Sequence, residues 1–152
     1  MIAREFMETA FVTASPDAAL GDVAALMVRH RVDGVAVVEG ERLVGMITAA
    51  EFLQLLLPNR VRFLDVDLYL GPRRLHQELL REIAGVRAKD VMTPAVHTVA
   101  PDTPLEQVIS LLGQHGRRHL PVVEEGRLVG MIDRIDVVRL FTHGSSREET
   151  RG

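Results

Sequence analysis

Two pairs of polar residues, each spaced three apart, stand where a short apolar run gives way to a helical pattern. Thr48 precedes Glu51, and Asp133 precedes Asp136. The run from Thr48 to Glu51 has the form of a capping box, and Asp133 is a good N-cap residue. A helix N-terminus also gathers free N–H groups and positive potential, so the same positions suit an anion. The residues alone favour capping over binding.

A basic triplet, Arg117-Arg118-His119, comes just before the apolar run Leu120–Val123. Guanidinium groups form charge-assisted hydrogen bonds to phosphate, so the triplet is a candidate phosphate-binding site. Two other interpretations stay open. The triplet lies in a solvated loop, or its cations stabilise the C-terminal end of a helix that ends near His115.

The composition excludes several kinds of catalytic chemistry. The chain has 152 residues and no cysteine, which rules out disulfides, thiolate metal sites and cysteine nucleophiles. The six histidines lack the His-Glu-x-x-His spacing or a comparable one, and no nucleophile elbow or glycine-rich phosphate loop occurs. We therefore predict a protein that is not an enzyme, holds no metal and requires no cofactor.

The charge balance argues against nucleic acids and membranes as partners. Lys and Arg number 18 against 21 Asp and Glu, and the chain has one Tyr and no Trp for stacking on bases. No window approaches the ~18 apolar residues of a membrane span. The first residues also lack the apolar run of a signal peptide. We expect a cytoplasmic protein with no nucleic-acid and no membrane partner.

The elements that must position these residues come as an internal repeat. The chain matches itself at an offset of 85 residues, with 18 identities over the 41 positions that align 7–47 with 92–132. The run Arg42–Ile47 recurs letter for letter as Arg127–Ile132. The sequence therefore consists of two copies of one unit, and each copy is too small to be stable alone.

Each copy is predicted to form a strand, a helix, two strands and a second helix. The first strands are Phe11–Thr13 and Val96–Val99, and the second helices begin at Thr48 and Asp133. Short apolar runs around a turn predict two hairpins, with strands at Val35–Val38, Leu43–Ile47, Leu120–Val123 and Leu128–Ile132. We expect the two copies to pack through pseudo-twofold symmetry around a single core.

The first helix of each copy needs an N-cap. In the second copy, Thr103 to Glu106 has the form of a capping box, with a proline at the first helical position. In the first copy, Ala18 replaces that threonine, so Ser15 or Asp17 is predicted to cap instead.

The segment between the copies also has patterned sequence. Apolar residues alternate with polar ones over Leu64–Leu70, which predicts an extended strand-like segment. Residues 73–84 place apolar side chains on one face of a helix, and Gly85 is predicted to end it. That face packs on its own domain, or else it forms a dimer or partner surface. Its members are Leu75, Leu79, Leu80 and Ile83.

Taken in order, the motifs resemble those of the cystathionine-β-synthase-type (CBS) domain. The second copy carries them most closely, in the runs Asp90–Pro94, Thr98–Leu105, Arg118–Val123 and Gly130–Asp133. The resemblance implies an α/β fold of tandem βαββα CBS repeats packed with pseudo-twofold symmetry, a pair known as a Bateman module. It also implies a homodimer shaped as a flat disc and a cleft that takes adenine nucleotides. We divide the chain into CBS repeat one (1–57), a linker with an amphipathic helix (58–88), CBS repeat two (89–142) and a flexible tail (143–152).

The resemblance assigns roles to the polar pairs. The hydroxyl and helix N-terminus of the motif face phosphate, and the acid three residues later accepts bonds from both ribose hydroxyls. The pair at Thr48 and Glu51 keeps the hydroxyl but has a longer acid, whereas the pair at Asp133 and Asp136 keeps the acid and adds a negative charge.

The two copies also differ in the cations implied for phosphate. The basic triplet at 117–119 is replaced in the first copy by Val32-Asp33-Gly34, so we expect at most one good anion site. Adenine is expected against the first strand of each copy. The predicted nucleotide-binding residues are Val12, Thr13, Thr48, Glu51, Val96, His97, Thr98, Arg117, Arg118, His119, Pro121, Asp133 and Asp136.

The sequence thus predicts a regulatory module that senses an adenine nucleotide (AMP, ADP or ATP) in the cleft between its repeats. Ligand binding would favour one arrangement of the repeats, and an unknown effector protein would read that arrangement. The alternative is a dimerisation or interaction scaffold that binds no ligand. Asp133 and the acidic 32–34 segment favour that alternative.

Overall fold

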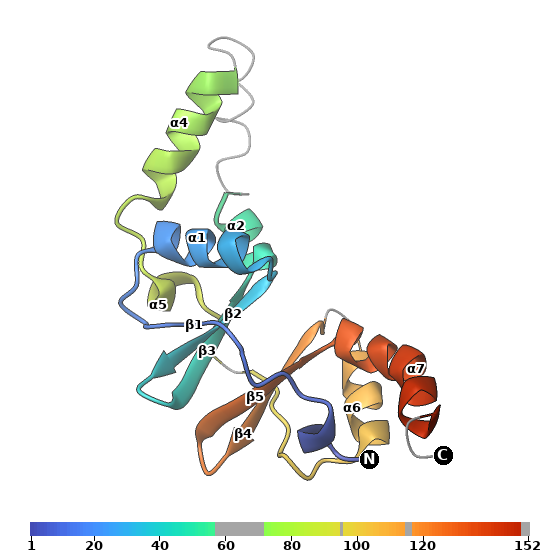
Figure 1. Cartoon of the computed structure of the whole chain (residues 1–152). Coiled ribbons are helices and arrows are strands. Elements are labelled where there is room, and N and C mark those ends of the chain that lie inside the picture. Colours follow the sequence, from blue (N-terminus) through green and yellow to red (C-terminus); the bar gives the residue numbers. More distant parts are fainter. Residues whose placement is uncertain (57–71, 95, 115–116, 150–152) are drawn as a thin grey trace. The chain divides into compact units, whose positions relative to one another are not determined.

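The computed structural model describes residues 1–56, 72–94, 96–114 and 117–149, which form helices and short strands (Figure 1). The first part contains η1 (Ala3–Glu5), β1 (Thr13–Ala14), α1 (Leu20–His30), β2 (Gly34–Glu39), β3 (Arg42–Thr48) and α2 (Ala49–Leu56). The second part contains α4 (Pro72–Ile83), α5 (Ala88–Val91), α6 (Leu105–Leu112), β4 (His119–Glu124), β5 (Arg127–Asp133) and α7 (Arg134–Glu149).

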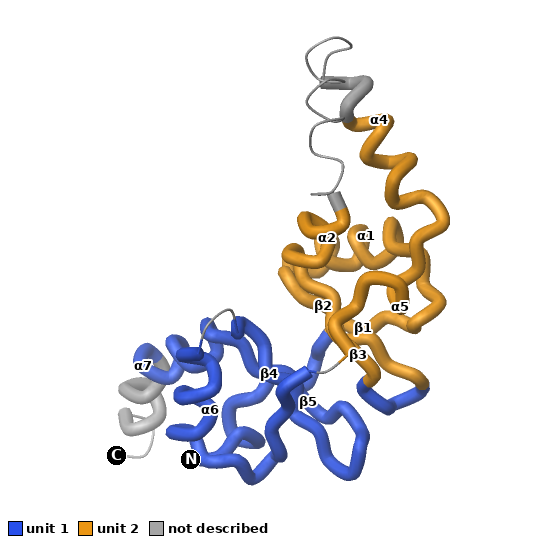
Figure 2. Tube along the Cα trace, turned by 180° about the vertical axis from the view of Figure 1, so that it is seen from behind, with its two compact units in different colours: residues 1–11, 40–43, 96–152 blue, residues 12–39, 44–95 orange. Residues whose placement is uncertain are grey.

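The chain divides into two compact units that do not follow the order of the sequence (Figure 2). Unit 1 consists of residues 1–11, 40–43 and 96–152. Unit 2 consists of residues 12–39 and 44–95. Each unit therefore combines most of one repeat with the leading segment of the other repeat.

Unit 2 contains the strands of the first repeat. β1 runs parallel to β2, with Thr13 opposite Ala36 and Ala14 opposite Val37, and β2 is hydrogen-bonded to β3. Helix α1 packs on β2, and α2 contacts α5 (Figure 1). The first strand lies slightly later than the predicted Phe11–Thr13, and the predicted hairpin is present.

Unit 1 contains the hairpin of the second repeat. β4 and β5 pair antiparallel from His119 opposite Asp133, with a shift of register between Val122 and Val123. Helix α6 packs on β4 and α7 on β5 (Figure 1). The strand predicted at Val96–Val99 is reduced to a single parallel bridge between Val99 and Val122.

Residues 1–8, called here the first arm, pack on the second repeat. The N–H of Ala3 donates to the carbonyl of Thr103 at 2.9 Å, and the N–H of Arg4 donates to the carbonyl of Pro101 at 2.8 Å. At its end, Glu8 forms an antiparallel bridge in unit 1. The N-terminus of the chain is therefore part of the second repeat's unit.

Residues 86–93, called here the second arm, pack on the first repeat in the same way. Ala88 N–H donates to the carbonyl of Ala18 and Lys89 N–H to that of Pro16, both at 2.9 Å. These bonds are the bonds of the first arm shifted by the repeat offset of 85 residues. The two repeats have therefore exchanged their leading segments symmetrically.

The arms also supply the helix starts with their missing partners. Leu20, at the start of α1, donates its N–H to the carbonyl of Val86 at 2.9 Å. Leu105, at the start of α6, donates its N–H to the carbonyl of Met1 at the same distance. A backbone carbonyl thus takes the place of a capping side chain at each of these helices.

The predicted side-chain caps of α1 and α6 were therefore wrong. Ala19 and Pro104 are the N-cap residues, and neither makes a side-chain cap bond. The Ser15 hydroxyl instead accepts from the N–H of Asp17, and the Thr103 hydroxyl accepts from the N–H of Ala100. Both hydroxyls close the preceding turn, which leaves the helix N–H groups to the arms.

Most of the described buried apolar side chains form two clusters, one in each unit, where the sequence predicted a single core. Ala36, Met46 and Leu128 are buried but belong to neither cluster. In unit 2 the cluster is Ala14, Leu20, Val23, Val35, Val37, Ile47 and Ala88. In unit 1 it is Ala3, Val99, Val108, Leu112, Leu120, Val122 and Ile132. Each cluster contains one alanine of an arm, so each core is completed by the exchanged segment.

Gly45 in β3 is required by the close approach of the second arm. A Cβ atom at this position would lie 2.7 Å from the sulfur of Met92 and 3.1 Å from the carbonyl oxygen of Thr93. Gly130 in β5 is similarly crowded by Met7 of the first arm. The glycine of the repeated Arg-Leu-Val-Gly-Met-Ile run is therefore where each arm docks on its strand.

Helix α4 confirms the helix predicted over residues 73–84, with boundaries shifted by one residue. Gly85 follows it with φ of 81°, the left-handed conformation that commonly ends a helix. Ile83 packs against the core of unit 2, while Leu80 stays 51% exposed. The strand-like segment predicted at Leu64–Leu70 lies outside the described residues. Among the described residues, no helix has the length and apolar content needed to cross a bilayer.

Candidate functional site

The start of helix α2 holds a hydrogen-bond network around the carboxylate of Glu51. Its Oε2 accepts the backbone N–H of Thr48 at 2.6 Å and also accepts the hydroxyl of Thr48. The Thr48 hydroxyl oxygen in turn accepts the N–H of Ala50 at 3.3 Å. The bond from the Thr48 N–H to Glu51 is one half of the predicted capping box, whereas the Thr48 hydroxyl accepts from Ala50 and not from the N–H of Glu51. The structure therefore brings Thr48 and Glu51 together and confirms the capping interpretation.

A third residue, Thr93, completes the network from the second arm. Its Oγ1 donates to Oε1 of Glu51 at 2.9 Å. Its backbone pairs with Met46 in both directions, at 2.9 and 3.1 Å, which holds the hydroxyl in place. Thr93 lies in the Asp90–Pro94 motif but was not among the predicted binding residues, because its partner Glu51 is 42 residues away in sequence.

The network keeps Glu51 ionised. Partial burial alone would raise the pKa of Glu51, because it disfavours the charged form. The hydrogen bonds from the Thr48 side chain and backbone and from Thr93 together outweigh that effect, so the pKa lies below its ordinary value of 4.5. At neutral pH the carboxylate is therefore an acceptor held in one orientation.

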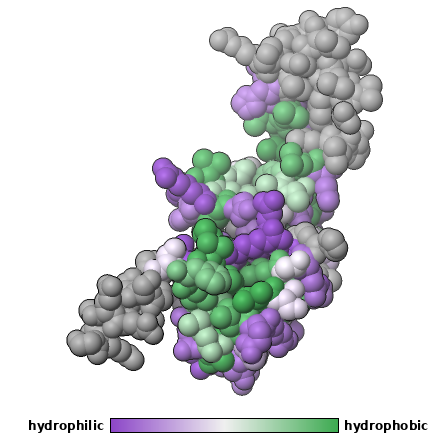
Figure 3. Space-filling model, turned by 90° about the vertical axis from the view of Figure 1, so that its right-hand side faces the viewer, coloured by the Kyte–Doolittle hydropathy of each residue, from purple (hydrophilic) through white to green (hydrophobic). Residues whose placement is uncertain are grey.

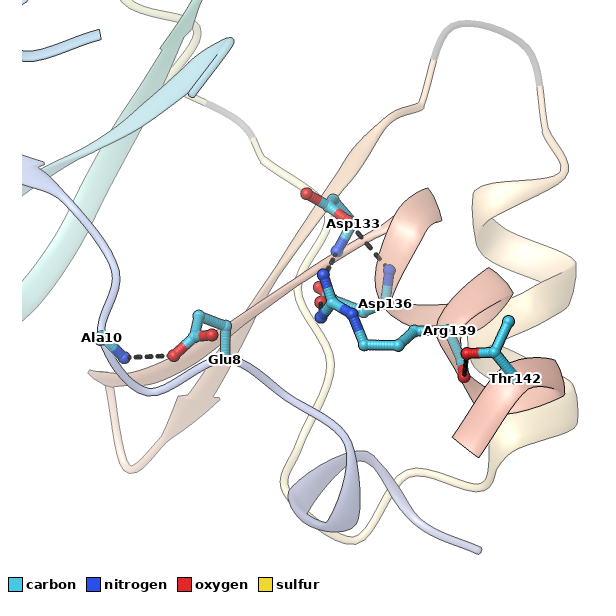
Figure 4. A network of polar contacts seen from close by, with 6 residues as sticks. All are labelled: Glu8, Ala10, Asp133, Asp136, Arg139 and Thr142. Atoms are coloured by element: carbon cyan, nitrogen blue, oxygen red, sulfur yellow. Dashed lines mark hydrogen bonds and ion pairs between the residues drawn. The ribbon is translucent and has the colours of Figure 1, made fainter. Parts of the chain in front are cut away.

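The start of helix α7 carries the equivalent acid of the second repeat, shown in Figure 4. Oδ2 of Asp136 accepts the N–H of Asp133 at 2.8 Å, and Oδ1 of Asp133 accepts the N–H of Asp136 at 3.1 Å. Arg139 donates to Oδ1 of Asp136 at 3.1 Å. The structure therefore brings Asp133 and Asp136 together as a reciprocal cap.

The environment of Asp136 has the opposite effect on its charge. The residue is buried, with 8% of its surface exposed. Burial raises the pKa of Asp136, the N–H of Asp133 lowers it, and the charge of Asp133 raises it again. The nearby Arg139 lowers it only in part, because that side chain is half exposed. The net pKa of Asp136 lies above its ordinary value of 3.8.

The first arm does not supply a hydroxyl to this second acid. Glu8 pairs through its backbone with Met131, as Thr93 pairs with Met46. Its carboxylate is turned to the N–H of Ala10, which it accepts at 2.8 Å (Figure 4). The second arm presents the hydroxyl of Thr93 to Glu51. At the equivalent position the first arm has the carboxylate of Glu8, which bonds to Ala10.

The remaining predicted residues of unit 2 lie on its first strand. The side chain of Val12 is half buried, and its carbonyl accepts the N–H of Ala36 at 3.3 Å. Thr13 is exposed in β1. These two residues belong to the same unit as Thr48 and Glu51.

The remaining predicted residues of unit 1 surround β4. Val96 is half buried, and both His97 and Thr98 are exposed. Pro121 is fully buried in β4, between Leu120 and Val122, which belong to the core cluster of unit 1. The exposed positions among them are the ones available to a ligand.

The basic triplet leads directly into β4. Arg117 is half buried, and its carbonyl accepts Nε of Arg134 at 3.0 Å. Arg118 is exposed, and His119 is the first residue of the strand. In unit 1 the cations therefore precede the strand that pairs with the one carrying Asp133.

Metal binding has no support in the described part of the chain, where no three His, Cys, Asp or Glu side chains are grouped as ligands. The site geometry instead consists of two helix starts, each with an acid three residues in. A family model for the CBS domain matches the chain twice, over residues 3–58 and 88–143. The chain belongs to the CBS domain family. Its fold is an α/β tandem of CBS repeats, as the sequence motifs predicted.

Among the curated relatives of this CBS protein is the chloroplastic CBSX1 of Arabidopsis thaliana, which is 32% identical over 132 residues. That match covers 82% of this chain and 56% of CBSX1. An A-adding tRNA nucleotidyltransferase of Geobacter sulfurreducens is 29% identical over 146 residues, 95% of this chain but only 14% of the enzyme. The CBS pair thus spans less than two thirds of these relatives' lengths.

A solved structure matches nearly end to end. The crystal structure of CBSX2 in complex with AMP has a TM-score of 0.73 and 28% identity, and the match covers 95% of this CBS chain and 98% of that one. CBSX2 is also a protein of Arabidopsis thaliana. A similar pair of repeats, that of CBSX2, therefore has a solved structure of similar extent with AMP bound.

Proposed function

We propose that the protein is a regulatory module that senses an adenine nucleotide such as AMP, ADP or ATP. The observation that carries this proposal is the ionised carboxylate of Glu51 beside the Thr48 hydroxyl at the start of α2. An ionised carboxylate accepts bonds from sugar hydroxyls, and a helix start presents N–H groups to phosphate. The AMP complex of CBSX2, at 28% identity, supports the choice of ligand.

Each of these groups has a proposed role in ligand binding. Glu51 and Asp136 accept ribose hydroxyls. The Thr48 hydroxyl donates its one proton to Glu51, so it must turn from that carboxylate before it can donate to phosphate. In the second repeat the cations take the phosphate role, because Asp133 places a negative charge at the helix start. The residues proposed for phosphate and adenine are Arg117, Arg118, His119, Val12, Thr13, Val96, His97, Thr98 and Pro121.

The signal follows from linkage between binding and conformation. A ligand that contacts both repeats stabilises the arrangement in which those contacts are made. An effector protein that prefers the same arrangement then binds more tightly in the presence of ligand, and by the same factor the effector strengthens ligand binding. A homodimer would place two such modules in one assembly.

Isothermal titration with AMP, ATP, an adenosyl sulfonium ligand and NAD tests the function directly. Glu51→Ala and Asp136→Ala should each weaken the binding of ribose-bearing ligands. Glu106→Gln, which changes an exposed acid in the first turn of α6, is the matched control and should bind as the native chain does. No heat and no thermal shift with any ligand at millimolar concentration would contradict the proposal.

The phosphate role has its own test. Arg118→Ala should weaken the binding of AMP and ATP more than the binding of adenosine, because only the nucleotides carry the phosphate charge that a guanidinium binds. An equal loss for all three ligands would show that Arg118 acts on the fold and has no phosphate role.

A second candidate is an interaction scaffold, and helix α7 carries the observation that favours it. Ile135, Val138 and Phe141 recur every third residue and are 54%, 53% and 82% exposed. Figure 3 views the molecule from the side of α7 and shows apolar surface there. Contiguous exposed apolar surface commonly marks a contact with another protein.

The scaffold commits to a second copy of this chain as the partner, and light scattering tests it. Val138→Asp should convert a dimer to a monomer, while Arg134→Ala, also on α7, should leave the mass unchanged. A scaffold that lacks ligand function requires a dimer together with no heat in every titration. A monomeric native chain would rule out this candidate.

A further inference from the structure

The hydroxyl of Thr93 is the one part of the Glu51 network that comes from outside the first repeat's own helix start. The two bonds on Oε2 come from Thr48, three residues away in sequence. The bond on Oε1 comes from Thr93, which is 42 residues away and belongs to the second arm. The two oxygens of Glu51 are therefore fixed by different segments of the chain.

This division matters because the acid is a glutamate. A glutamate has one more rotatable bond than an aspartate, and Thr48 alone restrains only one of its oxygens. A carboxylate that is held at a single oxygen can still turn about that point. The Thr93 hydroxyl removes this freedom, and it also favours the ionised form that accepts hydrogen bonds.

The second arm holds Thr93 firmly enough for this task. Its backbone exchanges two hydrogen bonds with Met46 of β3, and Met92 lies against Gly45. Farther back, Ala88 is fully buried in the core of unit 2. The hydroxyl of Thr93 is therefore presented to Glu51 from an anchored backbone.

From these contacts we propose that Thr93 is a positioning residue for ribose recognition by Glu51, an inference that rests on the proposed function. The ribose site of the first repeat is then complete only while the second arm is docked. By reciprocity, a ribose-bearing ligand that uses the oriented carboxylate stabilises the docked arm by the same factor. Thr93 lies three residues before Val96, where the chain enters unit 1.

The first test needs no ligand. Thr93→Val removes the hydroxyl at nearly constant volume and should raise the pKa of Glu51, measured by NMR titration of its side-chain carboxyl carbon. Thr93→Ser keeps the hydroxyl and should restore the native titration. Thr142→Val removes a hydroxyl that donates within α7 and is the matched control. An unchanged Glu51 titration in Thr93→Val would overturn the proposal.

The second test uses AMP and 2′,3′-dideoxy-AMP as probes in calorimetry. Thr93→Val should weaken the binding of AMP about ten-fold, because it weakens the hydrogen bond from a ribose hydroxyl to the charged carboxylate of Glu51. It should leave the dideoxy nucleotide unaffected, and Thr93→Ser should recover AMP binding. Equal weakening of both nucleotides would show a merely structural role and overturn the proposal.

Failure of the proposed function and failure of the positioning role of Thr93 would give different results. A native chain that binds neither nucleotide contradicts the proposed function, and with it the ribose role of Thr93. A native chain whose AMP binding is weakened by Glu51→Gln but not by Thr93→Val keeps the proposed function and overturns only the positioning role. Hydrogen exchange gives a third readout. AMP should slow the exchange of the backbone N–H at position 93 in the native chain, and it should not do so in the Thr93→Val variant.

Discussion

The two repeats place opposite chemistry around the same structural device. In the first repeat, the acid of the helix start is Glu51, and its partners are the hydroxyls of Thr48 and Thr93. Neutral donors stabilise the charge, and the pKa of Glu51 is lowered despite its burial. The network is therefore suited to accept further bonds from a neutral sugar.

In the second repeat, the acid is Asp136, and its nearest partner is another acid, Asp133. Arg139 is the cation that offsets this repulsion, yet the pKa of Asp136 is raised. The arm residue is Glu8, which turns away to Ala10. The difference teaches that one capping geometry is compatible with two charge environments, and that an arm hydroxyl contributes to the one around Glu51.

Exchanging the arm residues Thr93 and Glu8 should have the largest and most unequal effects on the free energy of unfolding. Thr93→Glu replaces the donor of Glu51 with a carboxylate, so it removes a charge-assisted bond and should lower the free energy of unfolding by about 2 kcal/mol. Urea denaturation measures the loss. The reciprocal change, Glu8→Thr, should lower the pKa of Asp136 and cost little stability. Equal losses for the two exchanges would show that the arm residue does not set the charge environment.

Neutralising Glu51 or Asp136 should have a smaller effect on the free energy of unfolding, and the two effects should be unequal. Glu51→Gln gives up the charge that two hydroxyls and an N–H stabilise, and should cost about 1–2 kcal/mol at pH 7. Asp136→Asn also removes the burial cost and the repulsion from Asp133, so its stability should stay within about 0.5 kcal/mol of the native chain. The same urea experiment compares them, and a larger loss for Asp136→Asn would reverse the comparison.

The two acids should also respond to pH with opposite signs. The folded pKa of Glu51 is lowered, so its contribution is present above the ordinary value of 4.5 and is lost as the pH falls through the folded pKa. The folded pKa of Asp136 is raised, so its contribution is present below 3.8 and is lost as the pH rises through the folded pKa. The stability difference between native chain and Glu51→Gln should therefore shrink on acidification. A constant difference from pH 7 to pH 3 would contradict this assignment.

Removing the cation of the second repeat should have the smallest effect. Arg139→Met should change the free energy of unfolding by less than about 0.5 kcal/mol, because the guanidinium is half exposed and partly screened. It should nevertheless raise the pKa of Asp136 further, which NMR titration detects. An unchanged titration would mean that the ion pair does not form in solution.

Local patterns were enough to predict most helices and strands and the two capping pairs, but not η1 or α5, and the strand expected at Val96–Val99 is a single bridge. The hairpin of Leu120–Val123 and Leu128–Ile132 was found because its apolar runs and turn are contiguous, and the structure confirms it. Thr48 and Glu51 were found for the same reason, since a capping box is complete within four residues. Interactions that close over a few residues are the ones a single sequence reveals.

The exchange of arms could not be predicted in that way. Ser15 and Thr103 looked like adequate caps, whereas the true partners of the helix starts are backbone carbonyls of Val86 and Met1. A carbonyl has no residue type, so no sequence pattern marks it as a partner. The role of Thr93 was hidden for a related reason, because its acceptor is 42 residues away.

The exchanged arms make the chain indivisible at its repeat boundary. A fragment ending after α2 lacks Ala88 in its core and the carbonyl of Val86 at the start of α1, and the complementary fragment lacks Ala3 and Met1. Two such fragments need each other as partners in a split-protein assay, where reassembly restores both cores at once. The arms therefore act as reciprocal tethers, and neither repeat is a separable part for protein engineering.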